Sequence, residues 1–255
     1  MKNNDAFRDS ALAAPEKLPL LAAETVKNWG KTLIVAPHPD DESLGCGGAI
    51  ALLRSYDCVV EVLVMSDGTL SHPNSKKFPA LVLRDLRENE IISALEILGG
   101  AAMNISFLRY PDRSVPNKDS DEFPQAVEIC QKFLEKTKPK TILLPWRRDP
   151  HPDHFAANQI ISAAKTHLSF APKIIEYPIW LWELATGADA PQSSEVKAWR
   201  LNIETVLAKK QTAIAAHRSQ TTDLIDDDPT AFRLTPEILM DFAAPWEIYL
   251  ETVDE

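Results

Sequence analysis

Two short polar segments contain the residue types that bind metal ions and transfer protons in hydrolytic enzymes. The first is HPDDE at residues 38–42 and the second is HPDH at residues 151–154, and each follows an apolar run. His-Pro-Asp therefore occurs twice in a chain that has only six histidines. One such segment would be typical of a turn that caps a helix. Two of them, one with an adjacent carboxylate, favour convergence on a single cation.

The first segment offers two ligands of different kinds. His38 and Asp41 are three residues apart across a turn that Pro39 stiffens. An imidazole and a carboxylate make up two-thirds of a catalytic zinc triad, which has three protein ligands and an open position. In an open parallel sheet such sites form beyond the carboxyl ends of the strands, so we expect the third ligand from the segment 151–154.

The glycines that follow allow a second interpretation. GCGG at residues 45–48 comes after an apolar run and opens a predicted helix, as a dinucleotide-binding loop would. The pattern G-x-G-x-x-G requires a third glycine at position 50, where this chain has Ile50. Five polar residues also stand between the strand and the glycines. The pattern therefore favours a metal site over a phosphate loop.

The surrounding elements alternate between strands and helices. Apolar runs predict strands at residues 32–37, 58–68, 105–110, 140–146, 173–182 and 246–253. Helical spacing and stop signals predict helices at residues 49–56, 81–100, 123–138, 154–168 and 204–219. This alternation predicts a three-layer α/β/α, Rossmann-like fold with a mostly parallel sheet. We expect one domain over residues 31–255, and residues 1–30 as a lead-in packed on or near it, with a short helix at 20–30.

Composition excludes several classes of function. A formal charge of −10 argues against a broad nucleic-acid or anionic-membrane surface. No apolar run approaches the ~20 residues of a membrane helix, and the first residues lack the apolar core of a signal peptide. The three cysteines Cys46, Cys58 and Cys130 form no C-x-x-C pair and indicate reduced thiols. We expect a cytoplasmic protein without membrane insertion or nucleic-acid partner.

The two segments resemble those of the LmbE-like or PIG-L-like zinc-dependent deacetylases of N-acetylated sugars. APHPDDE at 36–42 is similar to the family's A-H-P-D-D-E, although Pro37 stands where many members have alanine, and HPDH at 151–154 matches unaltered. Weaker similarities lie in VMSDG at 64–68, in the helix with Arg87 and Glu90, and in the segment 209–220. The resemblance spans residues 33–220.

The resemblance implies a role for each residue of the two segments. His38, Asp41 and His154 would bind one Zn²⁺ per chain, and Asp40 would be the general base. His151 would be the general acid or the oxyanion stabiliser, with Asp153 orienting it. Some relatives place a tyrosine near the second segment; here Asp149 stands two residues before His151, and no tyrosine is close in the sequence.

The expected reaction is the hydrolytic removal of an acetyl group from an N-acetylated amino sugar or its conjugate. Zn²⁺ would polarise the acetyl carbonyl and lower the pKa of a bound water, and Asp40 would accept its proton. A metal-dependent phosphoesterase is an alternative, but such enzymes usually bind two ions. A non-catalytic, zinc-braced sugar-binding module is another, but structural zinc sites usually have four Cys or His ligands.

Further residues are candidates for binding the substrate or supporting the site. Arg87, Asp112 and His217 could contact the sugar; the respective alternatives are a solvated helix charge, a turn residue and a helix-end histidine. Glu42 could accept a hydrogen bond from His38 or only favour the start of a helix. Loops 69–80, 111–124 and 183–196 should set selectivity. Residues 221–232 indicate a solvated acidic turn more than a lid.

Overall fold

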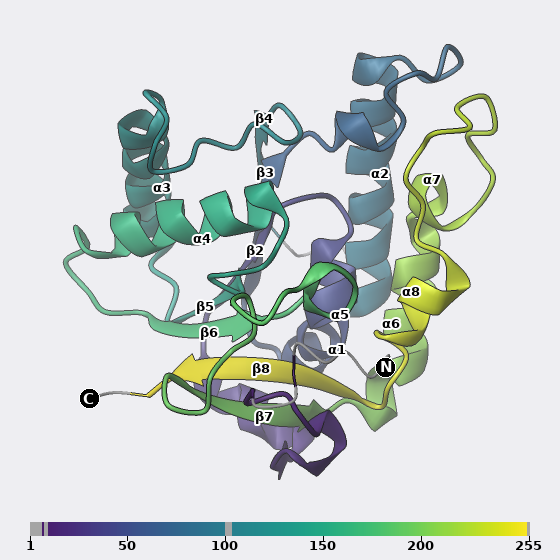
Figure 1. The fold of residues 1–255 in the computed structure, drawn as a ribbon. Helices are drawn as coiled ribbons and strands as arrows, with labels where there is room; N and C mark the ends of the chain where they lie inside the picture. Colours follow the sequence, from purple (N-terminus) through teal and green to yellow (C-terminus); the bar gives the residue numbers. More distant parts are fainter. Residues whose placement is uncertain (1–6, 8–9, 100–103, 254–255) are drawn as a thin grey trace.

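A single eight-stranded sheet organises the chain (Figure 1). The computed structural model describes residues 7, 10–99 and 104–253. The strand order is β1-β7-β8-β6-β5-β2-β3-β4, and every neighbouring pair is parallel except the two pairs that β8 forms with β6 and β7. The strands are β1 Leu20–Leu21, β2 Thr32–Ala36, β3 Val60–Ser66, β4 Asn104–Tyr110, β5 Thr141–Pro145, β6 Lys173–Tyr177, β7 Val196–Asn202 and β8 Trp246–Thr252. The mostly parallel α/β fold is confirmed.

Helices cover both faces of this sheet. The α-helices are α1 Asp41–Ser55, α2 Ala80–Gly99, α3 Phe123–Thr137, α4 Pro152–Lys165, α5 Leu181–Leu184, α6 Leu207–Ala216, α7 Arg218–Thr221 and α8 Pro236–Met240. Helices α1, α2 and α6 pack together on one face, and α3 and α4 pack together on the other (Figure 1). Strands β2, β3 and β5 are buried along their whole length because both faces are covered. None of the helices in the described ranges combines the length and apolarity that crossing a bilayer requires.

Several elements differ from the sequence prediction, and the helix predicted over residues 49–56 already begins at Asp41. The strand predicted over 173–182 ends at Tyr177, because Pro178 has no N–H for the ladder and the chain turns into α5. Strand β7 was not predicted, since its residues alternate between buried and partly exposed and form no continuous apolar run. The expected lead-in contributes strand β1, which pairs with β7, and a 3-10 helix Ala23–Trp29 that buries Trp29 in the core.

The topology brings the two polar segments to the same edge of the sheet. Strands β2 and β5 are neighbours in parallel register, with Thr32 paired to Thr141. The chain leaves the carboxyl end of β2 towards α1 and that of β5 towards α4. In the sheet, β3 lies on the far side of β2 and β6 lies on the far side of β5. Helices α1 and α4 therefore begin at a topological switch point, where open α/β sheets form binding sites.

The glycines of GCGG serve packing. A Cβ atom at Gly45 would lie 2.4 Å from Tyr177 Cδ2, and one at Gly48 would lie 2.5 Å from Ile203 Cγ2. A larger residue at Gly45 would push α1 away from β6, and one at Gly48 would push it away from the residue that follows β7. The glycines therefore bring the first turn of α1, which begins at Asp41, close to the sheet edge.

A buried ion pair fixes the same helix. Lys210 Nζ on α6 donates to Glu247 Oε1 on β8 at 2.8 Å, and both side chains are fully buried. The Glu247 carboxylate also accepts hydrogen bonds from the backbone N–H groups of Gly48 at 2.7 Å and Ala49 at 2.8 Å in α1. One carboxylate therefore connects β8, α6 and α1.

Replacement of Lys210 by methionine should destabilise the fold. The Glu247 carboxylate would remain buried without its cation, and removing one partner of a buried pair costs about 3–5 kcal/mol. Urea unfolding followed by circular dichroism measures the change. The matched control is Lys209→Met at the exposed neighbouring position, which should stay within about 0.5 kcal/mol of wild type. A Lys210→Met protein as stable as the control would contradict the anchoring role.

Candidate metal centre

The two polar segments meet around Asp41. Its Oδ2 lies 3.4 Å from His38 Nδ1 and 3.2 Å from His154 Nε2. Ring nitrogens of His38, His151 and His154 also lie within 4.8 Å of one another. The structure therefore brings together the three predicted ligands, from positions more than a hundred residues apart, and places His151 beside them.

The spacing and hydrogen bonding of these atoms fit a bound cation. Two ligands held at 2.0–2.1 Å from a tetrahedral Zn²⁺ lie about 3.3–3.4 Å apart, close to both distances from Asp41. Both ring nitrogens of His154 are buried and form no hydrogen bond, although Nε2 lies 3.2 Å from Asp41 Oδ2 and Nδ1 lies 3.4 Å from Asp149 Oδ1. A buried polar nitrogen without a partner is costly, and coordination to a cation would satisfy it.

The charges around the three histidines also require compensation. Five aspartates of this cluster are at most 7% exposed: Asp40, Asp41, Asp112, Asp149 and Asp153. Among the described residues, the buried arginine Arg87 contacts this cluster through Asp40. So many buried carboxylates are stable only when cations or protons balance them. Contacts with the aspartates offset the effect of burial and raise the pKa of His38 well above its usual value and that of His154 to about 9. Without a metal ion, these contacts favour the protonated forms of His38 and His154.

Outer contacts orient both imidazoles. His38 Nε2 donates to Asp153 Oδ2 at 3.0 Å and lies 3.4 Å from Asp112 Oδ1, which leaves Nδ1 facing Asp41. The prediction that Glu42 accepts from His38 is wrong, because Glu42 lies on the other side of the turn and its Oε2 accepts from the N–H of Asp40 at 3.0 Å. Carboxylates that hold a ligating histidine in this way fix its tautomer.

The corresponding partner of His154 is Asp149. Its Oδ1 lies 3.4 Å from His154 Nδ1, and its Oδ2 accepts from the N–H groups of Ile179 at 3.2 Å and Trp180 at 3.0 Å. Sequence reasoning noted Asp149 only as the residue in place of a tyrosine. Its position before the HPDH segment was the available signal, but its direction towards His154 depends on the turn after β5.

Asp40 has an unusual backbone and environment. Its φ angle is 145°, a region that disfavours side chains larger than glycine and that occurs mostly where function or surrounding structure imposes it. Burial raises the pKa of its carboxyl to about 6, although the Arg87 guanidinium opposes this rise. Asp40 lines a cavity that also exposes His38 and Asp41. The residue is therefore held in a fixed orientation next to the candidate ligands.

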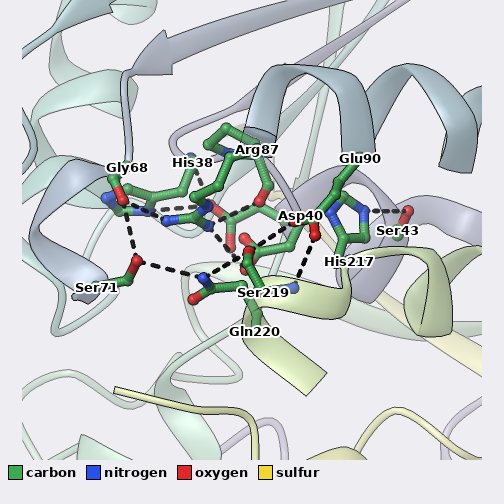
Figure 2. A network of polar contacts seen from close by, with 12 residues as sticks. His38, Asp40, Ser43, Gly68, Ser71, Arg87, Glu90, His217, Ser219 and Gln220 are labelled. Atoms are coloured by element: carbon green, nitrogen blue, oxygen red, sulfur yellow. Dashed lines mark hydrogen bonds and ion pairs between the residues drawn. The ribbon is translucent and has the colours of Figure 1, made fainter. Parts of the chain in front are cut away.

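Arg87 is a buried part of the site. It is 3% exposed and donates to Asp40 Oδ2 at 3.1 Å, Pro39 O at 2.8 Å and Gly68 O at 2.7 Å (Figure 2). The alternative of a solvated helix charge is therefore wrong. Glu90, one turn further along α2, accepts from the N–H and hydroxyl of Ser219 and connects α2 to α7 (Figure 2).

His151 is oriented differently from the expectation. The expected orienting group, the Asp153 carboxylate, contacts His38 and the N–H groups of Arg113 and Val115. His151 Nδ1 accepts instead from the backbone N–H of Asp153 at 3.2 Å. Burial and the neighbouring histidines lower the pKa of His151 to about 3. The ring is therefore neutral near pH 7, with its proton on Nε2.

The two remaining substrate-binding candidates lie at different depths. Asp112 lines the cavity and accepts from the N–H of Leu70 at 2.9 Å. His217 is 1% exposed and contacts Glu42 Oε1 through Nε2 at 3.0 Å, behind the turn that carries Asp40. Asp112 is therefore open to a ligand, whereas His217 supports Glu42.

A cavity of about 330 Å³ opens above this cluster. Each of the three predicted selectivity loops contributes to it, through Leu70, Arg113 and Leu184 among others. Residues 221–232 also reach it through Phe232. Most of this segment is exposed or half-buried, as expected of a solvated acidic turn, and carboxylates within it also accept hydrogen bonds from the backbone of residues 74, 76 and 77.

Comparison with known proteins places these features in a family. The family model PIG-L, described as GlcNAc-PI de-N-acetylase, matches residues 33–165, which include both polar segments. The chain is 25% identical over 198 residues to a probable N-acetyl-alpha-D-glucosaminyl L-malate deacetylase 2 of Bacillus cereus, and the match covers 76% of this chain and 86% of that protein. It is 29% identical over 158 residues to a diacetylchitobiose deacetylase of Thermococcus kodakarensis, covering 58% of this chain and 54% of that protein.

A solved structure shows the same fold. The N,N'-diacetylchitobiose deacetylase of Pyrococcus horikoshii superposes with a TM-score of 0.59 at 22% identity, covering 78% of this chain and 74% of that chain. The family model covers more than half of the sequence, and its matched region contains the whole His-Asp-His cluster. The chain therefore belongs to the PIG-L family of LmbE-like N-deacetylases.

Proposed function

We propose that this protein is a zinc-dependent N-deacetylase that hydrolyses the acetamide of an N-acetylated amino sugar or its conjugate. One observation carries the proposal: in a buried His-Asp-His cluster, His38 and Asp41 line a cavity, and a second carboxylate, Asp40, lines it beside them. His38, Asp41 and His154 would hold one Zn²⁺ per chain. Bound there, the ion supplies Lewis acidity that polarises a carbonyl oxygen and lowers the pKa of a coordinated water.

Asp40 would transfer the proton in both halves of the reaction. With a pKa of about 6 its carboxylate is ionised at neutral pH and still basic enough to accept a proton from the attacking water. The water oxygen bonds to the acetyl carbon, the C–N bond then breaks, and the proton passes from Asp40 to the amine nitrogen. The products are the free amine and acetic acid, which retains the second proton of the water and ionises to acetate by releasing it to solvent. Hydrogen bonding to Arg87 holds Asp40 in place during both transfers.

His151 would stabilise the negative charge that develops on the carbonyl oxygen. Its neutral ring offers an Nε2–H donor at the cavity, and its Nδ1 is fixed by a backbone N–H. A preorganised donor of this kind typically contributes 10²–10³ in rate. The proposal therefore assigns His151 the oxyanion role and gives Asp153 the role of positioning His38.

The sugar itself would be bound by polar groups on the cavity wall. Asp112 can accept a hydrogen bond from a sugar hydroxyl, and the Arg87 guanidinium borders the same cavity. His217 would act through Glu42, whose carboxylate accepts from the N–H of the strained Asp40. The proposed partner is a small-molecule or glycoconjugate substrate. The three cysteines are free, as a reducing compartment requires, and a cytoplasmic location stays a prediction.

Specific features favour hydrolysis of an amide over the two alternatives. Among the described residues, two sets of side chains are close enough to hold an ion: His38 with His151 and His154, and His38 with Asp112 and Asp153. Because both sets share His38, they fit one ion better than the two of a typical phosphoesterase. A structural brace would be closed by four ligands. Here the cluster faces a cavity and Asp40 stands beside the candidate ligands.

Two neighbouring substitutions should separate proton transfer from metal binding. Asp40→Asn should reduce acetate release from N-acetylglucosamine derivatives by about 10²–10⁴-fold while the bound metal is retained, because a general base is lost. Asp41→Asn should lose both the metal and the activity. Enzymatic acetate assays and elemental analysis of the purified variants measure the two properties. Full activity of Asp40→Asn would remove Asp40 from the mechanism.

Metal removal should abolish activity and reduce stability. Dialysis against a chelator should stop acetate release, and added Zn²⁺ should restore it. An ion present at 1,000 times its dissociation constant stabilises the folded protein by about 4 kcal/mol, so the apoprotein should also unfold at a lower temperature. Elemental analysis should give one ion per chain. Two ions per chain, with hydrolysis of phosphate esters, would favour the phosphoesterase.

Asp149→Asn should weaken metal binding although Asp149 is not itself a proposed ligand. The neutral amide can no longer act as a charged partner of His154 Nδ1, and loss of such a partner typically costs 10–100-fold in metal affinity. Competition with a chromophoric chelator measures the dissociation constant. Asp85→Asn, an exposed aspartate on α2, is the control and should bind as the wild type does. Equal affinity in both variants would argue that Asp149 only shapes the turn.

A further inference from the structure

The cavity above the cluster has an extensive apolar side. Five apolar residues line it, hereafter the apolar wall: Leu70, Trp180, Leu184, Phe232 and Ile238. They come from four separate parts of the chain, namely the turn after β3, α5 with the residue before it, the segment before α8, and α8 itself. The apolar wall and the polar floor therefore face one common space.

Several members of the apolar wall are unusually exposed for large apolar side chains. Leu70 is 47% exposed, Leu184 is 56% exposed and Phe232 is 39% exposed. The rings of Trp180 and Phe232 meet edge to face, with centroids 5.4 Å apart and an interplanar angle of 81°. Clustered apolar surface beside a binding site gains free energy when a ligand covers it.

The apolar wall combines two aromatic rings with three aliphatic side chains. A pyranose ring presents a narrow apolar face, and one aromatic ring is enough to stack against it. The acetamide must reach the floor formed by His38, Asp40 and Asp41, so the remaining wall faces whatever the sugar carries. A group attached to the sugar is therefore the natural occupant of the rest of the wall.

The charges that line the cavity give no particular preference for an acidic occupant. Four lining carboxylates, those of Asp40, Asp41, Asp112 and Glu183, face two guanidinium groups, those of Arg87 and Arg113. Arg87 is already bonded to Asp40 and to two backbone carbonyls. The chain as a whole carries a formal charge of −10. With the proposed Zn²⁺ included, the lining carries about as much positive as negative charge and therefore does not specifically attract an anionic aglycone.

The apolar wall is held in place before any ligand binds. The N–H of Phe232 donates to Ser71 O at 2.9 Å. The Asp227 carboxylate accepts from the N–H groups of Lys76 at 2.8 Å and Lys77 at 2.9 Å, which fastens the Phe232 segment to the loop after β3. A wall fixed in this way loses little conformational entropy when a ligand packs against it.

We propose that the substrate carries an uncharged, apolar aglycone of about the size of an aromatic ring, which packs on Trp180, Phe232 and Leu184 while the acetamide lies at the polar floor. This inference rests on the proposed deacetylase function. The proposed apolar aglycone differs from an acidic aglycone such as the malate in the name of the Bacillus cereus relative. The wall thus sets selectivity and the floor performs the chemistry.

The test compares three substrates with the metal-loaded protein. Acetate release is measured for the phenyl glycoside of N-acetylglucosamine, for free N-acetylglucosamine and for the malate glycoside. We expect kcat/KM for the phenyl glycoside to exceed that of both others by about 10-fold or more, the range that one apolar contact group provides. In Phe232→Ala and Leu184→Ser this preference should fall about 10-fold. Leu81→Ala, which removes an apolar side chain that is 67% exposed and outside the cavity, should keep it.

Other outcomes overturn the inference in recognisable ways. Equal rates for all three substrates would refute the apolar aglycone and leave the deacetylase function intact. A preference for the malate glycoside that Arg113→Gln abolishes would replace it with an acidic aglycone. If no substrate releases acetate, the proposed function fails, and the apolar wall is then tested by ligand binding alone. Phenyl glucosaminide should quench tryptophan fluorescence at concentrations at least 10-fold lower than methyl glucosaminide. Equal affinities of the two glycosides would refute the inference.

Discussion

The site depends on the concentration of negative charge at the carboxyl ends of β2 and β5. Five buried aspartates surround three histidines there, and Arg87 balances only part of their charge. Such a cluster is stable only with bound cations or with protonated histidines. The same imbalance explains why Asp41 can lie within ion-pair distance of two imidazoles. Metal binding and proton binding therefore compete for the same buried atoms.

The rest of the fold fixes the position of the Asp41 carboxylate. The glycines at 45 and 48 let α1 approach its neighbours closely, and Glu247 binds the backbone of the same helix from β8. Helix α1 begins with Asp41, so its placement sets the distance between the carboxylate and both histidines. A rigid scaffold of this kind favours a fixed ligand geometry over one that rearranges when the ion binds.

The sequence was sufficient to predict the features that depend on local patterns. Apolar runs identified most of the parallel strands, and the repeated His-Pro-Asp indicated which two strand ends meet. It did not reveal Asp149 as the partner of His154, or the exchange in which Asp153 holds His38 while a backbone N–H holds His151. These contacts depend on side-chain directions in turns. Strand β7 was missed because its burial comes from pairing with β8 and not from its own composition.

The division between floor and wall also follows the boundary of the family match. All candidate ligands and Asp40 lie within residues 33–165, whereas four of the five apolar-wall residues, Trp180, Leu184, Phe232 and Ile238, come after it. Chemistry that needs fixed distances to a cation tolerates little change in the residues that supply it. An apolar wall needs only shape and hydrophobicity, so its residues can differ among proteins that share one reaction. The distinctive property of this chain should therefore be sought in the segments after α4, which surround the reaction without taking part in it.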